Sequence, residues 1–303
     1  VKEIGLKSNI SYNEKDFLVW GVDKKEFLQE KAYKIDYTNK GIFLTNSNNF
    51  DGVIAGTTLF TQSLRYDTYT NFQNKVTGKI GVKHFHKNID NFTTSLNYGT
   101  GYKSPSLYEL SHDGGNELNP EYNKSFDISA KYKDIEIRYF KNKIDDLIGY
   151  NNNNTAYNYS DDLYENINGI SVIKGYEVNY QKDIKEDTLL SFNYTKQDAK
   201  DKDNKILGRV PKELLKVSID YYGIDKLHIN INSQYVGDRF DFNGETGAKT
   251  GKYTVINSII NYDIQKDLLT YLKIDNLTDK YYQTVDGYAT SPRAFYVGLN
   301  YNF

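Results

Sequence analysis

The amino-acid sequence predicts an all-β fold, an antiparallel up-and-down transmembrane β-barrel. Three observations lead to this prediction. Apolar and polar residues alternate with a period of two along most of the chain, the connections between the alternating segments are short and long in turn, and the composition is polar. Because successive side chains of a strand point to opposite faces, a strand between lipid and a polar interior needs apolar residues on one face only.

The composition separates this chain from an ordinary soluble domain. Only 38% of its 303 residues are hydrophobic, although 29 are tyrosine and 15 are phenylalanine, whereas globular domains carry about 45–50% apolar residues. No run approaches the roughly 20 apolar residues of a transmembrane helix, and no segment shows a convincing helical period. The net charge of −2 gives no electrostatic basis for binding nucleic acid.

The alternation delimits fifteen strands, and none of the four prolines falls inside them, as expected for strands paired on both sides. The predicted strands are 2–12, 17–31, 40–49, 57–66, 76–86, 92–100, 125–132, 135–148, 169–181, 188–199, 213–222, 228–235, 253–263, 268–276 and 294–303.

The connections between these strands alternate in length. The longer set is 32–39, 67–75, 101–124, 149–168, 200–212, 236–252 and 277–293. Since every second connection of an up-and-down sheet lies at the same end, the short turns gather at one end and the long loops at the other. Outer-membrane barrels show this arrangement, with short periplasmic turns and longer extracellular loops.

The last ten residues carry the strongest alternation in the chain. One face of this strand is apolar or aromatic, and it consists of Phe295, Val297, Leu299, Tyr301 and Phe303. An ending of this kind resembles the assembly signal of bacterial outer-membrane β-barrels. The resemblance implies that outer-membrane lipid and the barrel-assembly machinery are partners of the chain.

An odd number of strands indicates that the chain is a fragment. Single-chain bacterial barrels have even strand numbers, and an unpaired sheet edge is untenable in lipid. The sequence starts at Val1 and shows no signal peptide. We therefore expect an N-terminal part and an odd number of strands to be missing upstream.

Several segments, in order, resemble the C-terminal part of TonB-dependent outer-membrane receptors. The stretch from Gly287 to Phe295 (GYATSPRAF) places the ending nearest to the cobalamin-receptor branch of this family. The other segments are NYGTGYKSPSLYEL from Asn97, NELNPEYNKS from Asn116, DDLIGY from Asp145, YENINGISVIKGYEV from Tyr164, QYVGDRFD from Gln234 and DNLTDKYY from Asp275.

The resemblance implies a single barrel domain of about 22 strands filled by an N-terminal plug, of which residues 1–303 would form the C-terminal part. It implies uptake of a scarce, bulky nutrient, cobalamin first and a ferric siderophore as the alternative. A TonB energy-coupling complex would drive uptake by pulling on the plug. Since plug and coupling segment are not in the chain, this part alone is not expected to transport. No cofactor and no enzymatic activity are implied.

Arg209 is the first candidate ligand-binding residue. It lies in the long 200–212 connection just before a strand, and the resemblance implies that an arginine at this place reaches toward the ligand. The alternative is a solvated loop arginine. Because arginine offers a rigid fork of donors that lysine lacks, Arg209→Lys is an informative change.

Aromatic residues of the long loops are the next candidates, since large rings give a bulky ligand contact area at low entropic cost. The alternatives are the interfacial aromatic girdle of a barrel or contacts between loops, which we favour for Tyr281 and Tyr282. The loop candidates are Tyr157, Tyr159, Tyr164, Phe240, Phe242 and Tyr288.

We expect no metal site. Asp161 and Asp162 beside an asparagine run lack the spacing of a calcium loop. His84 and His86 share a strand face, but zinc needs three or four converging ligands and no third partner is evident near these or near His112 and His228.

Two other classes of protein remain open from the residues alone. A passive porin has about 16–18 strands and an open channel, and steady ion conductance would favour it. An outer-membrane hydrolase would combine acidic residues with histidine, for example Asp161 with His112, and predicts turnover that is lost when either is replaced.

Overall fold

The computed structural model describes residues 1–30, 34–52, 54–112, 117–152 and 162–302. Within these ranges the chain forms seventeen strands and one short helix. The elements are β1 (Lys2–Ser11), β2 (Phe17–Gln29), β3 (Ile35–Asp51), β4 (Gly56–Tyr69), β5 (Lys75–His86), β6 (Phe92–Lys103), α1 (Leu107–Ser111), β7 (Glu121–Tyr132), β8 (Ile135–Asn152), β9 (Asp162–Lys185), β10 (Thr188–Lys200), β11 (Glu213–Ile224), β12 (Leu227–Val236), β13 (Phe240–Phe242), β14 (Thr246–Lys249), β15 (Tyr253–Gln265), β16 (Leu268–Asp275) and β17 (Ala294–Tyr301).

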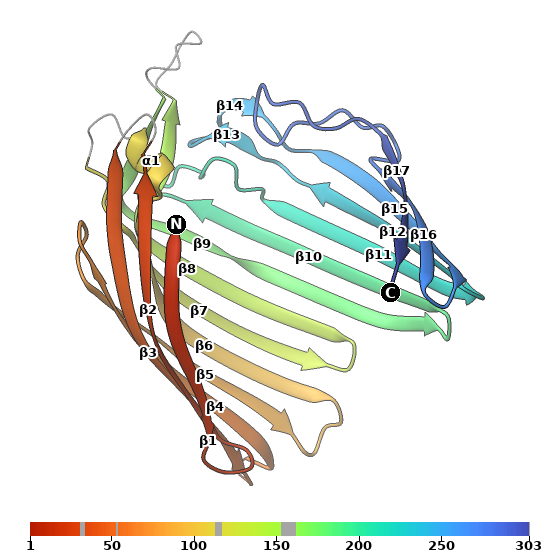
Figure 1. Cartoon of the computed structure of the whole chain (residues 1–303), viewed down its shortest axis with the longest axis horizontal. Helices are drawn as coiled ribbons and strands as arrows, with labels where there is room; N and C mark the ends of the chain where they lie inside the picture. The colour runs from red at the N-terminus through yellow and green to blue at the C-terminus, as the bar shows by residue number, and fades with distance from the viewer. Residues whose placement is uncertain (31–33, 53, 113–116, 153–161, 303) are drawn as a thin grey trace. The chain divides into compact units, whose positions relative to one another are not determined.

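Fifteen strands form one sheet in which hydrogen-bonded neighbours follow chain order, from β1 to β12 and then β15, β16 and β17 (Figure 1). The strands β13 and β14 form a separate antiparallel hairpin within the connection between β12 and β15. The predicted all-β, antiparallel up-and-down fold and its fifteen main strands are confirmed. Closure into a barrel and the total of about 22 strands stay predictions.

The observed strands differ from the predicted ones mainly by running further into the longer connections. β3 begins at Ile35 where 40 was predicted, β7 at Glu121 where 125 was predicted, and β9 at Asp162 where 169 was predicted. In these extensions polar pairs such as Glu26 opposite Thr38 alternate with aromatic pairs such as Phe27 opposite Tyr37. Hydrophobic alternation therefore marks only the part of a strand with one apolar face.

The short helix α1 was not predicted, because five residues are too few for a helical period to be visible. The sequence nevertheless contains a signal for the start of this helix, the capping box Ser106-x-x-Glu109. The Ser106 hydroxyl accepts from the Glu109 backbone N–H at 3.2 Å, and the Glu109 carboxylate accepts from the Ser106 N–H at 2.7 Å. No helix in the described ranges is long and apolar enough to cross a membrane.

The chain divides into two compact units, and each is described here by itself. Unit 1 comprises Val1–Lys133, Tyr139–Lys174 and Lys200–Asn204. Unit 2 comprises Asp134–Arg138, Gly175–Ala199 and Lys205–Phe303.

In unit 1, the register of the strands gathers apolar side chains on one face of the sheet. Leu6 lies opposite Val22, Val22 opposite Ile42, Ile42 opposite Tyr66, and Tyr66 opposite Val76. We call this side the apolar face and the other side the polar face. Hydrogen bonds between side chains cross the polar face, as in Thr45–Ser63 at 2.7 Å, Ser95–Ser129 at 2.8 Å and Asn97–Asp127 at 3.0 Å.

Unit 2 repeats this division between the two faces. On its apolar face, Ile229 lies opposite Ile260, Ile260 opposite Leu272, and Leu272 opposite Val297. On its polar face, a ladder of asparagines crosses three strands: Asn257 donates to Asn232 at 3.1 Å, Asn232 to Asn230 at 2.9 Å, and Asn230 to Ser218 at 2.7 Å.

The C-terminal strand β17 presents the predicted apolar residues on one face. Phe295, Val297, Leu299 and Tyr301 are 62%, 77%, 70% and 50% exposed, and Phe303 lies outside the described residues. Whether this strand acts as an assembly signal stays a prediction. The exposure shows that nothing in the described part of the chain covers this apolar face.

Candidate functional site

The long connections of unit 1 are held together by ionic contacts around α1. Lys103, at the end of β6, places its ammonium 3.3 Å from the Glu109 carboxylate and 3.0 Å from that of Glu121. The Glu121 carboxylate also accepts from the Ile148 backbone N–H at 3.1 Å. One lysine thus connects the ends of β6, α1 and β7, and Glu121 extends the connection to β8.

A buried tyrosine fixes the segment that leads into α1. Tyr37 of β3 is 3% exposed, stacks on Phe27 at 4.4 Å and meets Phe72 edge-on at 5.2 Å. Its hydroxyl donates to the Pro105 carbonyl at 3.1 Å. This anchor explains why α1 contacts β2 and β3 (Figure 1), although it follows β6 in the chain.

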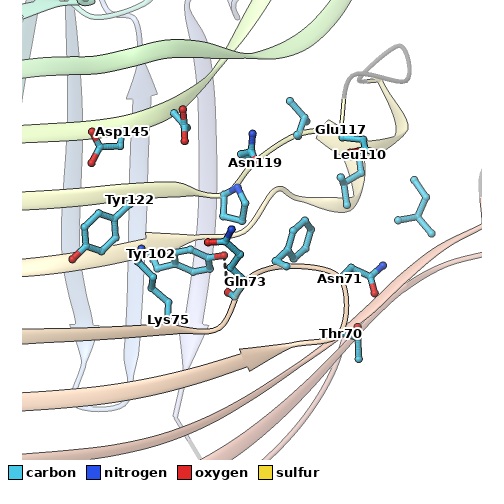
Figure 2. Close-up of a pocket in the computed structure, with 15 residues that line it drawn as sticks. Thr70, Asn71, Gln73, Lys75, Tyr102, Leu110, Glu117, Asn119, Tyr122 and Asp145 are labelled. Carbon is cyan, nitrogen blue, oxygen red and sulfur yellow. Dashed lines mark hydrogen bonds between the residues drawn. The ribbon is translucent and has the colours of Figure 1, made fainter.

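A cavity of about 940 Å³ opens in unit 1 between these long connections (Figure 2). The Tyr102 hydroxyl donates to the Gln73 carbonyl at 3.0 Å, and the Lys75 ammonium lies 4.1 Å from the centre of the Tyr122 ring. The lining is Ile35, Thr70, Asn71, Phe72, Gln73, Lys75, Tyr102, Leu110, Glu117, Leu118, Asn119, Pro120, Tyr122, Asp145 and Asp146. Rings beside amides and carboxylates suit a ligand that combines flat apolar surface with many hydrogen-bonding groups.

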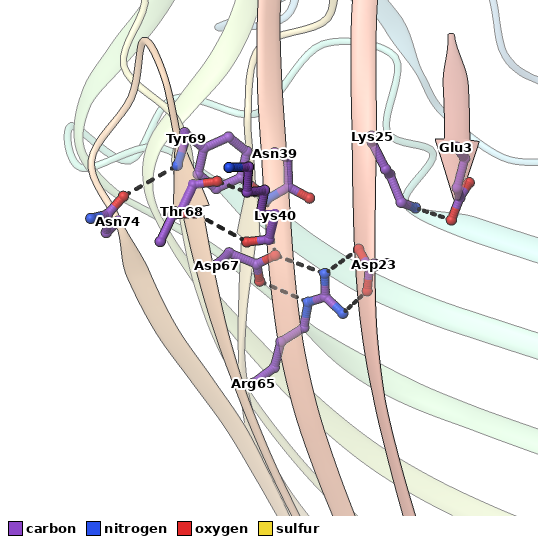
Figure 3. Close-up of polar contacts among 10 residues, drawn as sticks. All are labelled: Glu3, Asp23, Lys25, Asn39, Lys40, Arg65, Asp67, Thr68, Tyr69 and Asn74. Atoms are coloured by element: carbon purple, nitrogen blue, oxygen red, sulfur yellow. Dashed lines mark hydrogen bonds and ion pairs between the residues drawn. The ribbon is translucent and has the colours of Figure 1, made fainter. Parts of the chain in front are cut away.

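An ion triad lies on the polar face of unit 1, and Figure 3 shows Arg65 reaching from β4 to two carboxylates. The guanidinium donates to Asp67 at 2.7 and 2.8 Å and to Asp23 of β2 at 2.8 and 2.9 Å. Gly41 of β3 lies between them, and a Cβ there would be 2.0 Å from the nearest guanidinium nitrogen. The triad therefore requires glycine at position 41, because any side chain there would overlap the guanidinium of Arg65.

Tyr164 is the predicted aromatic candidate that lies in unit 1. Its ring meets Tyr150 at 5.3 Å and Tyr108 of α1 at 6.0 Å, and its N–H donates to the His112 carbonyl at 2.8 Å. The ring thus lies against aromatic residues of β8 and α1, and its contact with a ligand stays a prediction. Tyr157 and Tyr159 lie outside the described residues, as does Asp161, and the side chain of Asp162 is not described.

Arg209 lies in unit 2 and makes an ion pair that the sequence did not suggest. Its Nε donates to Asp241 at 3.1 Å, and its N–H donates to the Phe240 carbonyl at 2.7 Å. The Asp241 side chain is 3% exposed and that of Arg209 39%, and Asp241 also accepts from the Asp286 N–H at 3.1 Å. The guanidinium is therefore oriented by a buried carboxylate, while the arginine side chain stays partly exposed.

The hairpin β13–β14 carries Phe240 and Phe242. Phe240 is partly exposed, and the Lys249 ammonium lies 5.5 Å from the centre of its ring. Asp238, just before the hairpin, pairs with Lys249 at 2.7 Å and with Lys252 at 3.4 Å. The hydrogen bond from Lys249 lowers the pKa of Asp238 below its usual value, and the same bond raises the pKa of Lys249.

The remaining aromatic candidates lie in the last long connection. Tyr288 and Tyr281 are 70% and 77% exposed, whereas Tyr282 packs against Tyr253 with the ring centres 4.5 Å apart. The connection is joined to the β12–β13 segment by Arg239, which donates to the Thr284 carbonyl at 2.7 Å. In unit 2, Arg209, Phe240, Phe242 and Tyr288 thus belong to connections that hydrogen bonds hold together.

The histidines show no metal geometry within the described residues. His84 and His86 lie with their ring centres 4.4 Å apart, but no group of three or more potential ligands occurs in the described part of the chain. His84 instead contacts the Thr58 hydroxyl at 2.8 Å, and His228 contacts the Asp220 carboxylate at 2.9 Å.

Comparison with known proteins identifies the family. A sequence profile described as "TonB dependent receptor-like, beta-barrel" matches residues 9–277. The chain therefore belongs to the family of TonB-dependent receptor β-barrels, as the resemblance had indicated. This is a family of outer-membrane receptors and transporters and not of enzymes.

Among curated relatives, the vitamin B12 transporter BtuB of Vibrio cholerae serotype O1 is 29% identical over 257 residues. The match covers 81% of this chain and 40% of that protein. The chain therefore spans less than half the length of the curated relatives it matches.

Solved structures share the fold at lower identity. The siderophore receptor PirA from Acinetobacter baumannii has a TM-score of 0.73 at 16% identity, and a mutant of the ferric enterobactin receptor PfeA from Pseudomonas aeruginosa has a TM-score of 0.74 at 17% identity. The copper transporter OprC has 0.73 at 15%. These matches cover 99% of this chain and 54%, 53% and 56% of the three structures.

Proposed function

We propose that the chain is the C-terminal part of the barrel of an outer-membrane TonB-dependent receptor that takes up cobalamin. The observation that carries the ligand class is the 29% identity to a vitamin B12 transporter over 81% of the chain. The solved siderophore and copper receptors share only 15–17%. A ferric siderophore remains the alternative ligand of the same uptake.

The two faces of the sheet support placement in a bilayer. An apolar face that the described chain leaves exposed needs apolar surroundings, because apolar surface in water is unfavourable. A polar face crossed by hydrogen bonds suits a plugged or hydrated interior. The outer membrane is the corresponding location, with the long connections outside, and residues 1–303 belong to a single barrel domain.

The partners follow from the same proposal. Outer-membrane lipid surrounds the apolar face, and the barrel-assembly machinery inserts the chain by its final strand. A plug carried elsewhere in the full-length receptor contacts the TonB complex. Energy for uptake then enters through the plug and not through this chain.

In this receptor Arg209 contacts the ligand, and Asp241 positions Arg209. The guanidinium of Arg209 has five donors, and its Nε–H donates to Asp241, which orients the group. A side chain oriented before binding loses less conformational freedom when the ligand arrives. The cavity lined by Tyr102 and Tyr122 offers further contact area in unit 1.

The test is ligand binding by the full-length receptor in detergent, measured by calorimetry with cyanocobalamin and with ferric enterobactin. We expect cyanocobalamin to bind. Replacing Arg209 by alanine should weaken binding about 10- to 100-fold, since a hydrogen bond to a charged group contributes about 1.5–3 kcal/mol. The affinity of Arg209→Lys should lie between those of the wild type and Arg209→Ala, because lysine keeps the positive charge but lacks the planar fork of donors.

Arg138→Lys is the matched control. Arg138 also pairs with a carboxylate, Glu177, at 3.1 Å, but it lies in β8 four residues after the short turn at the other end of the sheet, so its replacement should leave ligand binding unchanged. If only ferric enterobactin binds, the ligand of the receptor is a siderophore and not cobalamin. Binding of neither, together with steady conductance in a planar bilayer, would favour the porin instead.

A further inference from the structure

On the apolar face of unit 1, strands β1 to β4 form an open groove of about 560 Å³ that nothing in the proposed uptake uses. Its apolar lining includes Ile4 and Leu6 of β1, Val22 of β2, Ile42 of β3 and Tyr66 of β4. These side chains are well exposed, from 40% for Val22 to 73% for Ile4.

Two lysines lie side by side at one end of the groove. Lys24 of β2 is opposite Lys40 of β3 in the ladder, and the same register row contains Ile4 and Thr68. Opposite residues of neighbouring strands have Cβ atoms about 4.5–5.5 Å apart. Both lysines line the groove, so one small anion could contact both ammonium groups.

The charges around this end of the groove are not balanced. The next register row on the same face contains Lys2, Glu26 and Thr38. Lys24 pairs with Glu26, whereas Lys40 is exposed and forms no ion pair with an acidic side chain in the described residues. Three lysines face one glutamate in the two rows, which leaves two positive charges beside an apolar groove.

We propose that this groove binds an anionic membrane lipid, one whose phosphate is not balanced by a cationic headgroup, with an acyl chain along the apolar lining and the phosphate between Lys24 and Lys40. The inference rests on the membrane placement proposed above. Lipid beside a barrel usually needs only an apolar surface, whereas two lysines directly opposite each other in the ladder repel unless an anion lies between them. The lysines lie toward the end of the strands with the long connections, and the lipid belongs to the leaflet on that side.

Trp20 provides a local probe for this proposal. It is the one tryptophan of the chain and lies on the same face of β2, two residues from Val22 and opposite Leu44. Two residues along a strand span about 7 Å. Bromine atoms on an acyl chain in the groove would therefore quench the fluorescence of Trp20.

The experiment uses the full-length receptor in phosphatidylcholine nanodiscs, titrated with phosphatidylglycerol brominated on its acyl chains or with phosphatidylcholine brominated in the same way. The signal of Trp20 is the difference between the wild type and Trp20→Phe. We expect half-quenching at a mole fraction about fivefold lower for phosphatidylglycerol, the factor for one lysine near a membrane surface.

Lys24→Gln with Lys40→Gln should remove this preference. Lys79→Gln with Lys83→Gln should keep it, because these lysines alternate with Ile80 and Val82 of β5 and so lie on the polar face. Equal quenching by both lipids in the wild type, or an unchanged preference in the first double variant, would overturn the site for an anionic lipid. Quenching by neither lipid would overturn the membrane placement itself.

Discussion

The Arg65 triad provides the sharpest test of how the polar face is held together. Arg65 makes four hydrogen bonds to Asp23 and Asp67, between 2.7 and 2.9 Å. The side chains of Asp23 and Asp67 are 11% and 9% exposed, and that of Arg65 is 30% exposed. Replacing Arg65 by methionine keeps most of the side-chain volume and leaves both carboxylates without their cation.

The expected cost follows from burial. Removing one partner of a buried ion pair costs about 3–5 kcal/mol, because the remaining charge is desolvated and uncompensated. Here water reaches the arginine side and can enter the space, so we expect a loss of about 2–4 kcal/mol in the free energy of unfolding. Replacing all three residues, as Arg65→Met with Asp23→Asn and Asp67→Asn, should recover most of that loss because no unpaired charge remains.

The assay is urea unfolding of the full-length receptor in lipid vesicles, with the free energy taken from midpoint and slope. Gly41→Ala is a second perturbation of the same contact, since the added methyl group would displace the guanidinium. A loss below about 0.5 kcal/mol for Arg65→Met, the usual range of surface substitutions, would refute the reasoning. A triple variant no more stable than the single variant would also refute it.

Two further predictions concern the faces of the sheet and the loop hairpin. Leu299→Arg on the apolar face should cost about 2–4 kcal/mol near the bilayer midplane and Asn300→Arg much less; equal costs by the same urea assay would show that the two faces are assigned wrongly. Around the hairpin, the lowered pKa of Asp238 means that its pairing with Lys249 stabilises above the ordinary carboxyl value of 3.8 and is lost as pH falls through the lowered pKa. The raised pKa of Lys249 means that the pairing is complete below 10.5 and is lost as pH rises through the raised pKa. A spin label on the hairpin should therefore be least mobile between these limits, and Lys249→Gln should flatten the dependence of its mobility on pH. If that dependence is unchanged in the variant, the ion pair is not its cause.

The candidate site shows where reasoning from the sequence ends. Arg209 was predicted from a resemblance, but its partner Asp241 is 32 residues away, and no local pattern connects the two. Asp23 and Arg65 are 42 residues apart and meet only because β2, β3 and β4 pair in one register. The capping box of α1, by contrast, spans four consecutive residues and could have been read directly.

The sequence by itself determined the all-β fold, the fifteen main strands and the residues of each face, because a period of two is a local property of the backbone. It could not determine where strands end in the long connections, since apolar residues there, such as Tyr37 opposite Phe27, no longer keep to the apolar face. The tertiary structure decided which side chains meet across strands, including the Arg65 triad, the Arg209–Asp241 pair and the Lys24–Lys40 pair. Such meetings depend on register and loop conformation, which are set by contacts between residues far apart in the chain.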